Sequence, residues 1–160
     1  MIHTPETISD TVARGLRAAD DPPRSGDGFK SAATYAGLSD DFCQGAWKHL
    51  REDGDLPQAS NKAWGMVAET VKAISAHHGG IIHTHRSILL VARELAQVVR
   101  GSGDIETAAW INNAFWTARG LHANFYENEE SEDQVADGVQ LCEQLSDRLY
   151  QLFWPDRSVS

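Results

Sequence analysis

Apolar residues recur every three or four positions through most of this chain, and this spacing is the feature that most restricts its fold. Positions three and four apart share one face of an α-helix, so each such run predicts an amphipathic helix. No segment has the alternating, β-branched pattern of a strand. We therefore expect an all-α protein, with five helical runs between residues 38 and 154: Leu38, Phe42, Ala46 and Leu50; Ala63, Val67, Val71 and Ile74; Ile88, Ala92, Leu95 and Val98; Ala108, Phe115, Ala118 and Leu121; Val135, Val139, Cys142, Leu145, Leu149 and Leu152.

Short polar stretches between these runs carry signals for helix ends. Ser39 is expected to begin the first helix, and Asp55, with Pro57 in the first turn, to begin the second. Ser131 and Gln134 have the spacing of a capping box before the last run. Because the connections are short, neighbouring helices must be antiparallel. The sequence thus predicts an antiparallel up-and-down bundle of four long helices plus one shorter helix.

The N-terminal part differs from this body. One short amphipathic helix is predicted there by Ile8, Val12, Leu16 and Ala19. Residues 20–28 then contain two Pro, two Gly and four charged residues, which predicts a linker. We therefore divide the chain into an N-terminal arm at residues 1–37, a helical bundle at 38–154 and a C-terminal tail at 155–160. The arm is expected to pack loosely or against a partner.

Composition limits the function classes. A net charge of −9 argues against a general grip on nucleic acid, which depends on neutralising phosphates, but does not exclude a local basic groove. The only cysteines, Cys43 and Cys142, suit free thiols in a reducing cytoplasm. No apolar run approaches the roughly 20 residues that span a bilayer, and residues 1–5 do not resemble a signal peptide. We expect a soluble cytoplasmic protein with no membrane contact.

The densest polar chemistry lies in residues 118–128, ARGLHANFYEN, near the end of a helical run. Arg119, His122 and Tyr126 would project from one face of that helix. Asn124 would lie about 140° from Arg119, so it joins them only if the helix ends or bends, for which Gly120 is the weak point. We take Arg119, His122, Asn124 and Tyr126 as the candidate catalytic unit. The alternative is a buried helix end whose polar groups satisfy neighbouring backbone.

Two segments resemble a known family. Residues 52–65, EDGDLPQASNKAWG, continuing to VKA at residues 71–73, together with LHANFYE at residues 121–127, look like the archaeal and bacterial PaREP family. Proteins of that family are similar to the HEPN superfamily of helical bundles. The resemblance covers roughly residues 40–153 and implies an antiparallel four-helix core that forms a homodimer.

For chemistry, the resemblance implies a metal-independent ribonuclease or a relative that has lost this activity. Active HEPN ribonucleases carry an arginine, which holds the phosphate, followed four to six residues later by a histidine, which transfers protons. Arg119 matches the arginine and Tyr126 the aromatic that often follows, but Asn124 stands where the histidine is expected. An amide does not exchange protons near neutral pH, so His122 would have to supply the imidazole.

Four of the seven histidines, His77, His78, His83 and His85, lie within residues 77–85. A glycine hinge between them is compatible with a zinc or small-ligand site, but their spacing matches no established zinc motif and no cysteine is near. A polar connection between helices is the alternative. We assign no metal and no cofactor. The resemblance places a pair like His85 and Arg86 at the start of a helix, where it either packs or faces a ligand.

Lys62 and Lys72 lie on adjoining faces of one predicted helix and are candidate ligand-binding residues with His85 and Arg86. Solvated surface lysines are the alternative. The tryptophans are expected mostly in the core, with one or two at an interface: Trp47, Trp64, Trp110, Trp116 and Trp154.

Three functions follow from these patterns. The first is an HEPN-like binding or regulatory module, dimeric, with RNA or a protein as partner. The second is a toxin-like, metal-independent endoribonuclease that uses Arg119 with His122 and Asn124. The third is a metal- or small-ligand-binding bundle built on residues 77–85.

Overall fold

The computed structural model describes residues 5–21, 30–128 and 130–157, which are helical apart from short connections. These residues form α1 (Pro5–Ala18), α2 (Ala32–Lys48), α3 (Leu56–His77), α4 (His85–Gly101), α5 (Ile105–Glu127) and α6 (Glu132–Phe153). The described ranges contain no strand, which confirms the all-α class. Among the same residues, no helix combines the length and apolar character needed to cross a membrane.

Side-chain caps begin the helices where polar residues precede apolar runs. Asp55 accepts a hydrogen bond from the backbone N–H of Gln58 at 3.1 Å, and Pro57 lies in the first turn of α3. Ser131 and Gln134 form the predicted capping box at the start of α6. Both predictions are confirmed. They could be made from the sequence because an N-cap depends on side chains within three residues of the helix start.

The predicted start of the first long helix at Ser39 is wrong. α2 begins at Ala32, and the hydroxyl of Ser31 caps its first turn. Ser39 lies buried in the middle of α2, where its hydroxyl donates to the carbonyl oxygen of Met66 on α3 at 3.1 Å. A serine hydroxyl that is satisfied by a neighbouring helix need not cap its own. The expected division between residues 37 and 38 therefore falls inside α2.

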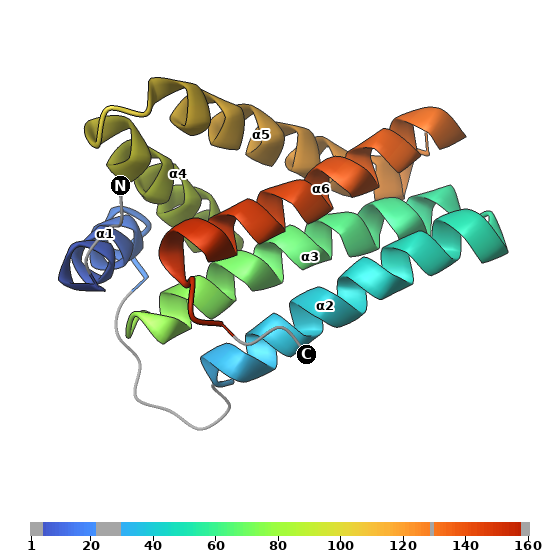
Figure 1. The fold of residues 1–160 in the computed structure, drawn as a ribbon. Helices are drawn as coiled ribbons and strands as arrows, with labels where there is room; N and C mark the ends of the chain where they lie inside the picture. Colours follow the sequence, from blue (N-terminus) through green and yellow to red (C-terminus); the bar gives the residue numbers. More distant parts are fainter. Residues whose placement is uncertain (1–4, 22–29, 129, 158–160) are drawn as a thin grey trace.

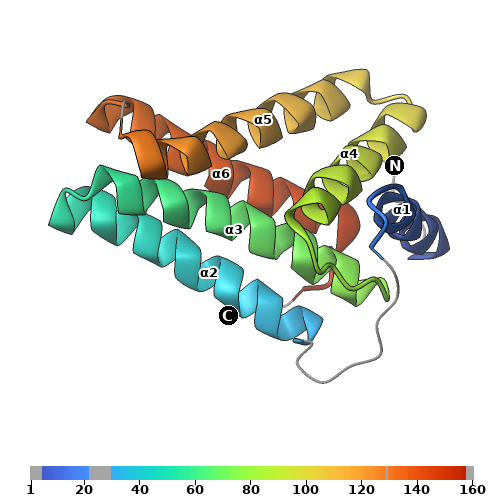
Figure 2. The same cartoon turned by 180° about the vertical axis from the view of Figure 1, so that it is seen from behind.

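α3 lies at the centre of the molecule. In Figure 1, α2 runs along one side of it and α6 along the other, and Figure 2 shows α5 beside α3 and α6 from behind. Most apolar side chains of α3 are buried, and Val67, Val71 and Ile74 are fully enclosed. A helix that is buried on nearly every face must be surrounded by other elements, which explains the arrangement.

α1 and α4 pack together at one end of the long helices (Figure 1). Ile8 and Val12 of α1 are buried, as the predicted short helix requires. A Cβ atom at Gly15 would lie only 2.8 Å from the Cα atom of Val91 on α4, so the two helix backbones are in close contact. The N-terminal helix thus joins the same core as the rest.

A buried carboxylate fastens the segment after α1 to the start of α4. Oδ1 of Asp21 lies 2.7 Å from Nδ1 of His83, and Oδ2 accepts hydrogen bonds from the hydroxyl of Ser87 at 2.6 Å and from the backbone N–H of His83 at 2.8 Å. Burial alone would raise the pKa of Asp21, but the hydrogen bonds from Ser87 and His83 lower it below its ordinary value of 3.8.

We predict that Asp21→Asn lowers the free energy of unfolding by about 1.5–3 kcal/mol at neutral pH, because hydrogen bonds to a charged group contribute about that much. The folded-state pKa of Asp21 is depressed, so its contribution is complete above 3.8 and is lost as the pH falls through the lower folded value. Urea unfolding should show the largest difference above pH 3.8 and a shrinking one below it. The exposed neighbour provides the control: Asp20→Asn should change stability by less than about 0.5 kcal/mol. A difference for Asp21→Asn that does not narrow in acid would contradict this account.

Candidate functional site

The stretch that carries the candidate site lies within α5. This helix begins after Asp104, whose side chain accepts from the backbone N–H of Thr107, and continues without a break through Gly120 to Glu127. It ends at Asn128, which has a left-handed backbone with φ of 51°. Because the helix continues through Gly120, side chains five residues apart point in different directions.

The side chain of Asn124 has a structural role in the core. It is buried, with the residue only 3% exposed. Nδ2 donates to the hydroxyl of Ser60 on α3 at 2.9 Å, and Oδ1 accepts from the backbone N–H of Glu130 at 3.0 Å. The amide thus joins the end of α5 to α3 and to the connection before α6. The structure does not bring Asn124 to the face that carries Arg119.

His122 meets His85 at the point where α3, α4 and α5 come together. Their ring centroids are 5.5 Å apart, and both rings lie against Trp64 of α3, at 5.9 Å for His122 and 5.6 Å for His85. Phe115 closes the cluster on another side, 5.7 Å from Trp64. The sequence predicts both histidines as site residues but in separate sets, and nothing in their spacing indicates that Trp64 joins them.

The surroundings of His122 favour its neutral form. Partial burial lowers its pKa, and the charge of a protonated His85 would lower it further. A neutral imidazole has one nitrogen that donates and one that accepts. His122 therefore stays ready to accept a proton at neutral pH, whereas Asn124 offers no such group.

Arg119 lies on the outer surface of α5 and is exposed. Its guanidinium carbon is 5.1 Å from the ring centroid of Trp116, one turn earlier on the same helix. Trp116 is itself 71% exposed, so it is not a core residue and is available at the surface. Together the two side chains form a cation–π pair that is open to solvent.

The remaining predicted residues are spread over several surfaces. Lys62 places its ammonium group 4.9 Å from the ring centroid of Phe42 on α2, and Lys72 pairs with Glu69 at 3.2 Å. Arg86 is exposed in the first turn of α4. Tyr126 belongs to α5, but its side chain lies outside the described part of the structure.

The four histidines of residues 77–85 do not converge. His77 stacks on Trp154 with ring centroids 4.3 Å apart, and Nε2 of His78 lies 2.7 Å from the carbonyl oxygen of Phe153. His83 contacts Asp21 and His85 belongs to the Trp64 cluster, as described above. Within the described ranges no three histidine, cysteine or acidic side chains form a group that could hold a metal ion. These histidines fasten the α3–α4 connection to three different parts of the molecule.

We predict that Asn124→Ala lowers the free energy of unfolding by about 1–3 kcal/mol, because the Ser60 hydroxyl and the Glu130 N–H both lose a partner. The matched control is Asn113→Ala, which removes an exposed amide from the same helix and should cost less than about 0.5 kcal/mol. Both values come from urea unfolding followed by circular dichroism. Equal stability of the two variants would show that Asn124 has no structural role.

Comparison with known proteins agrees with the segments that suggested a family. The model of the archaeal PaREP1/PaREP8 family matches residues 35–146, from the first turn of α2 into α6. No curated protein and no solved structure matches the chain. The matched region includes Trp64, His85, Arg119, His122 and Asn124. This chain therefore belongs to the archaeal PaREP1/PaREP8 family.

Proposed function

We propose that this protein is an HEPN-like helical-bundle protein that acts as a homodimeric binding or regulatory module. Two pairs of helices support the bundle part of this proposal. α2 packs along α3, and α5 packs along α6, with only a few residues between the helices of each pair. Short connections of this kind are typical of antiparallel neighbours in a helical bundle.

The exposed face of α5 carries the binding part of the proposal. Trp116 and Ile105 are the large apolar side chains that the described surface exposes most, at 71% and 59%. Both lie on α5, and Arg119 adds its guanidinium beside Trp116. Tryptophan and arginine are the residues most enriched among those that contribute most to binding at protein interfaces. A large exposed indole is costly in water and is explained if a partner covers it.

A second copy of the chain is the partner that we propose for this face. Apart from Trp116 and Arg119, the exposed residues of α5 between residues 107 and 124 are uncharged: Asn112, Asn113, Thr117, Gly120 and Ala123. A weakly charged surface suits a two-fold interface, in which the same patch of both subunits meets and strong like charges would repel. It suits RNA less well, because RNA binding depends on several cations that neutralise phosphates.

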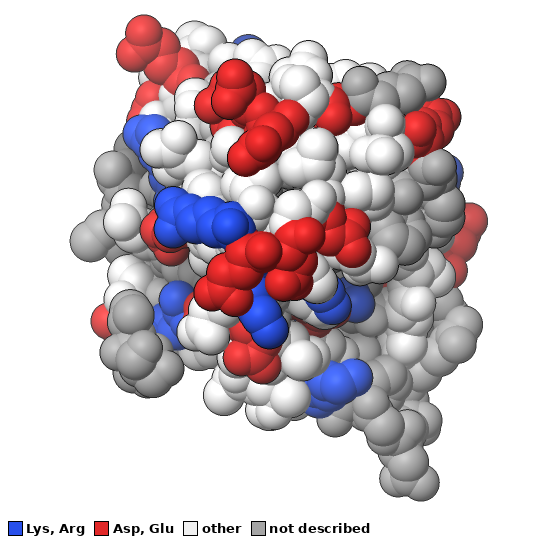
Figure 3. Space-filling model, turned by 90° about the vertical axis from the view of Figure 1, so that its right-hand side faces the viewer, with Lys and Arg blue, Asp and Glu red and all other residues white. Residues whose placement is uncertain are grey.

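The charges elsewhere also limit RNA association to a local contact. Figure 3 looks onto the end of the molecule at the right of Figure 1, where the α2–α3 turn lies. Among the described residues of that face, Lys and Arg side chains lie singly among groups of acidic ones and form no continuous basic patch. With a net charge of −9, a broad electrostatic attraction to RNA is not expected.

We predict that Trp116→Ala weakens dimerisation at least about tenfold, since truncating a central aromatic at an interface costs about 2 kcal/mol or more. Sedimentation equilibrium across a concentration series measures the effect. Thr117→Ala, an exposed neighbour on the same helix, should leave the association constant unchanged. Monomer stability should change little in either variant, because both side chains are exposed. A monomeric wild type at all concentrations, or equal dimerisation of both variants, would refute the proposed interface.

The ribonuclease remains a second candidate because of one observation, the contact between His85 and His122. In metal-independent RNA cleavage the 2′-oxygen attacks phosphorus while a base takes its proton, and an acid gives a proton to the departing 5′-oxygen. Neutral His122 has the state that the base requires, and a protonated His85 would supply the acid. Arg119 would hold the phosphate. Asn124, which is bound to Ser60 and Glu130, takes no part.

Incubation of a mixed RNA pool with purified protein in EDTA separates the two candidates. The binding-module proposal predicts no cleavage above the level without protein. The ribonuclease candidate predicts cleavage that His122→Ala, His85→Ala and Arg119→Ala each abolish. His77→Ala is the matched control, since it removes an imidazole that stacks on Trp154 away from this cluster. Cleavage with this pattern of variants would overturn the binding-module proposal.

A further inference from the structure

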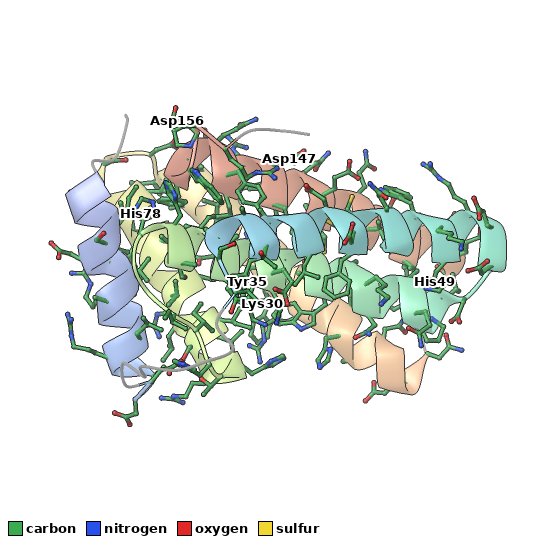
Figure 4. The ribbon with its side chains drawn as sticks, turned by 90° about the horizontal axis from the view of Figure 1, so that it is seen from below. Lys30, Tyr35, His49, His78, Asp147 and Asp156 are labelled. Carbon is green, nitrogen blue, oxygen red and sulfur yellow. The ribbon has the colours of Figure 1, made fainter. Side chains whose placement is uncertain are left out.

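Three adjoining hollows form one groove between α2 and α6, which we call the α2–α6 groove. The central hollow, of about 380 Å³, has Met66 of α3 as part of its floor. It shares Glu143 and Asp147 with a hollow of about 620 Å³ beside Trp47. It shares Asp147 and Tyr150 with a third, of about 290 Å³, near Trp154. The groove therefore follows α6 for about three turns, and Figure 4 shows Asp147 on α6 where that helix runs alongside α2.

The walls of this groove are acidic. Asp40 and Asp41 of α2 face Glu143 and Asp147 of α6 across the central hollow. Burial raises the pKa of Asp147, and the nearby charges of Glu143 and Asp40 raise it further. Among the described residues, no lysine or arginine nitrogen lies within 4.0 Å of the Asp147 carboxylate, although Arg157 lowers its pKa from farther away. Carboxylates that raise one another's pKa in this way are stabilised by an added cation.

The chain itself shows which cation fits. Arg157, which follows α6, lines the central hollow and is mostly buried, with its side chain 11% exposed. Its guanidinium carbon lies 3.8 Å from the ring centroid of Tyr150, and Nη1 is 3.4 Å from Oδ2 of Asp40. Arg51 stacks in the same way on Trp47 at the other end, 4.3 Å from the ring centroid. At both ends of the groove, a guanidinium group of the chain thus stacks on an aromatic ring, and carboxylates lie nearby.

An unused polar atom in the same hollow points to a missing ligand. Ser146 is only 3% exposed and lines the central hollow, and its hydroxyl oxygen is buried with no hydrogen-bond partner in the structure. A buried hydroxyl without a partner is unfavourable, because it has lost the hydrogen bonds that it makes with water. A donor group entering between Asp147 and Ser146 would remove that cost. This observation is independent of the charges.

We propose that the α2–α6 groove binds an arginine-bearing segment of a partner protein, with guanidinium groups beside Glu143 and Asp147 and a donor to Ser146. Arginine fits better than lysine because its planar fork stacks on rings and pairs with carboxylates through two hydrogen bonds. A metal ion fits less well, because the described carboxylates form no group that could hold one. Arg157 of this chain already contacts Asp40 and Tyr150 in the groove, so it would compete with an arginine of the partner for those two side chains.

Fluorescence anisotropy with a labelled peptide of alternating arginine and glycine tests this proposal on the full chain. Asp147→Asn and Glu143→Gln should each weaken binding about tenfold. Asp137→Asn removes the same charge from an exposed position on the same helix and should have little effect. Circular dichroism and thermal unfolding establish that each variant folds.

A second pair of variants separates the groove from overall charge. Arg157→Ala should tighten peptide binding several-fold, because it frees Asp40 and the Tyr150 ring. Arg148→Ala removes the same charge and a similar contact, with Trp110, outside the groove, and should not tighten binding. The proposal is overturned if the peptide does not bind, if both arginine variants act alike, or if Asp137→Asn weakens binding as much as Asp147→Asn. Spermidine is tested in parallel, and binding of spermidine alone would replace the protein partner by a polyamine.

Discussion

The near-complete burial of α3 is the constraint on which the other helices depend. Its small residues Ala59, Ala63 and Ala73 are fully enclosed, and short side chains at these positions let the neighbouring helices approach closely. α2, α5 and α6 each cover part of the surface of α3. Removing apolar surface from water is the largest favourable term in folding, so a central helix of this kind gathers the others around it.

Buried hydrogen bonds to α3 determine the rotation of α2 and of α5 about their own axes. Ser39 of α2 bonds Thr70 of α3 at 2.8 Å, and Asn124 of α5 bonds Ser60 of α3 at 2.9 Å. Apolar contacts tolerate small rotations, but a buried polar group that loses its partner costs about 1–3 kcal/mol. These pairs therefore select one rotation of α2 and one of α5. The rotation of α5 that the Asn124–Ser60 hydrogen bond favours determines which side chains of α5 face solvent.

With α5 rotated in this way, its polar and aromatic side chains point in three directions. Asn124 points inward and holds the fold, His122 points sideways to Trp64 and His85, and Trp116 with Arg119 points to solvent. The outward pair supports the proposed dimer. The α2–α6 groove lies on different helices and is lined by carboxylates instead. The proposed dimer and the proposed arginine-binding groove therefore use different helices and surfaces of contrasting chemistry.

The sequence by itself determined where most helices lie and how several of them begin. Apolar spacing and the caps at Asp55 and Ser131 are local signals, because the atoms involved lie within about one helical turn. Only the tertiary structure decided that Ser39 bonds to α3 instead of capping α2, and that His85 meets His122 across Trp64. These contacts join residues far apart in the chain, and they depend on how each helix is rotated and crossed when its apolar face packs, which no local spacing specifies.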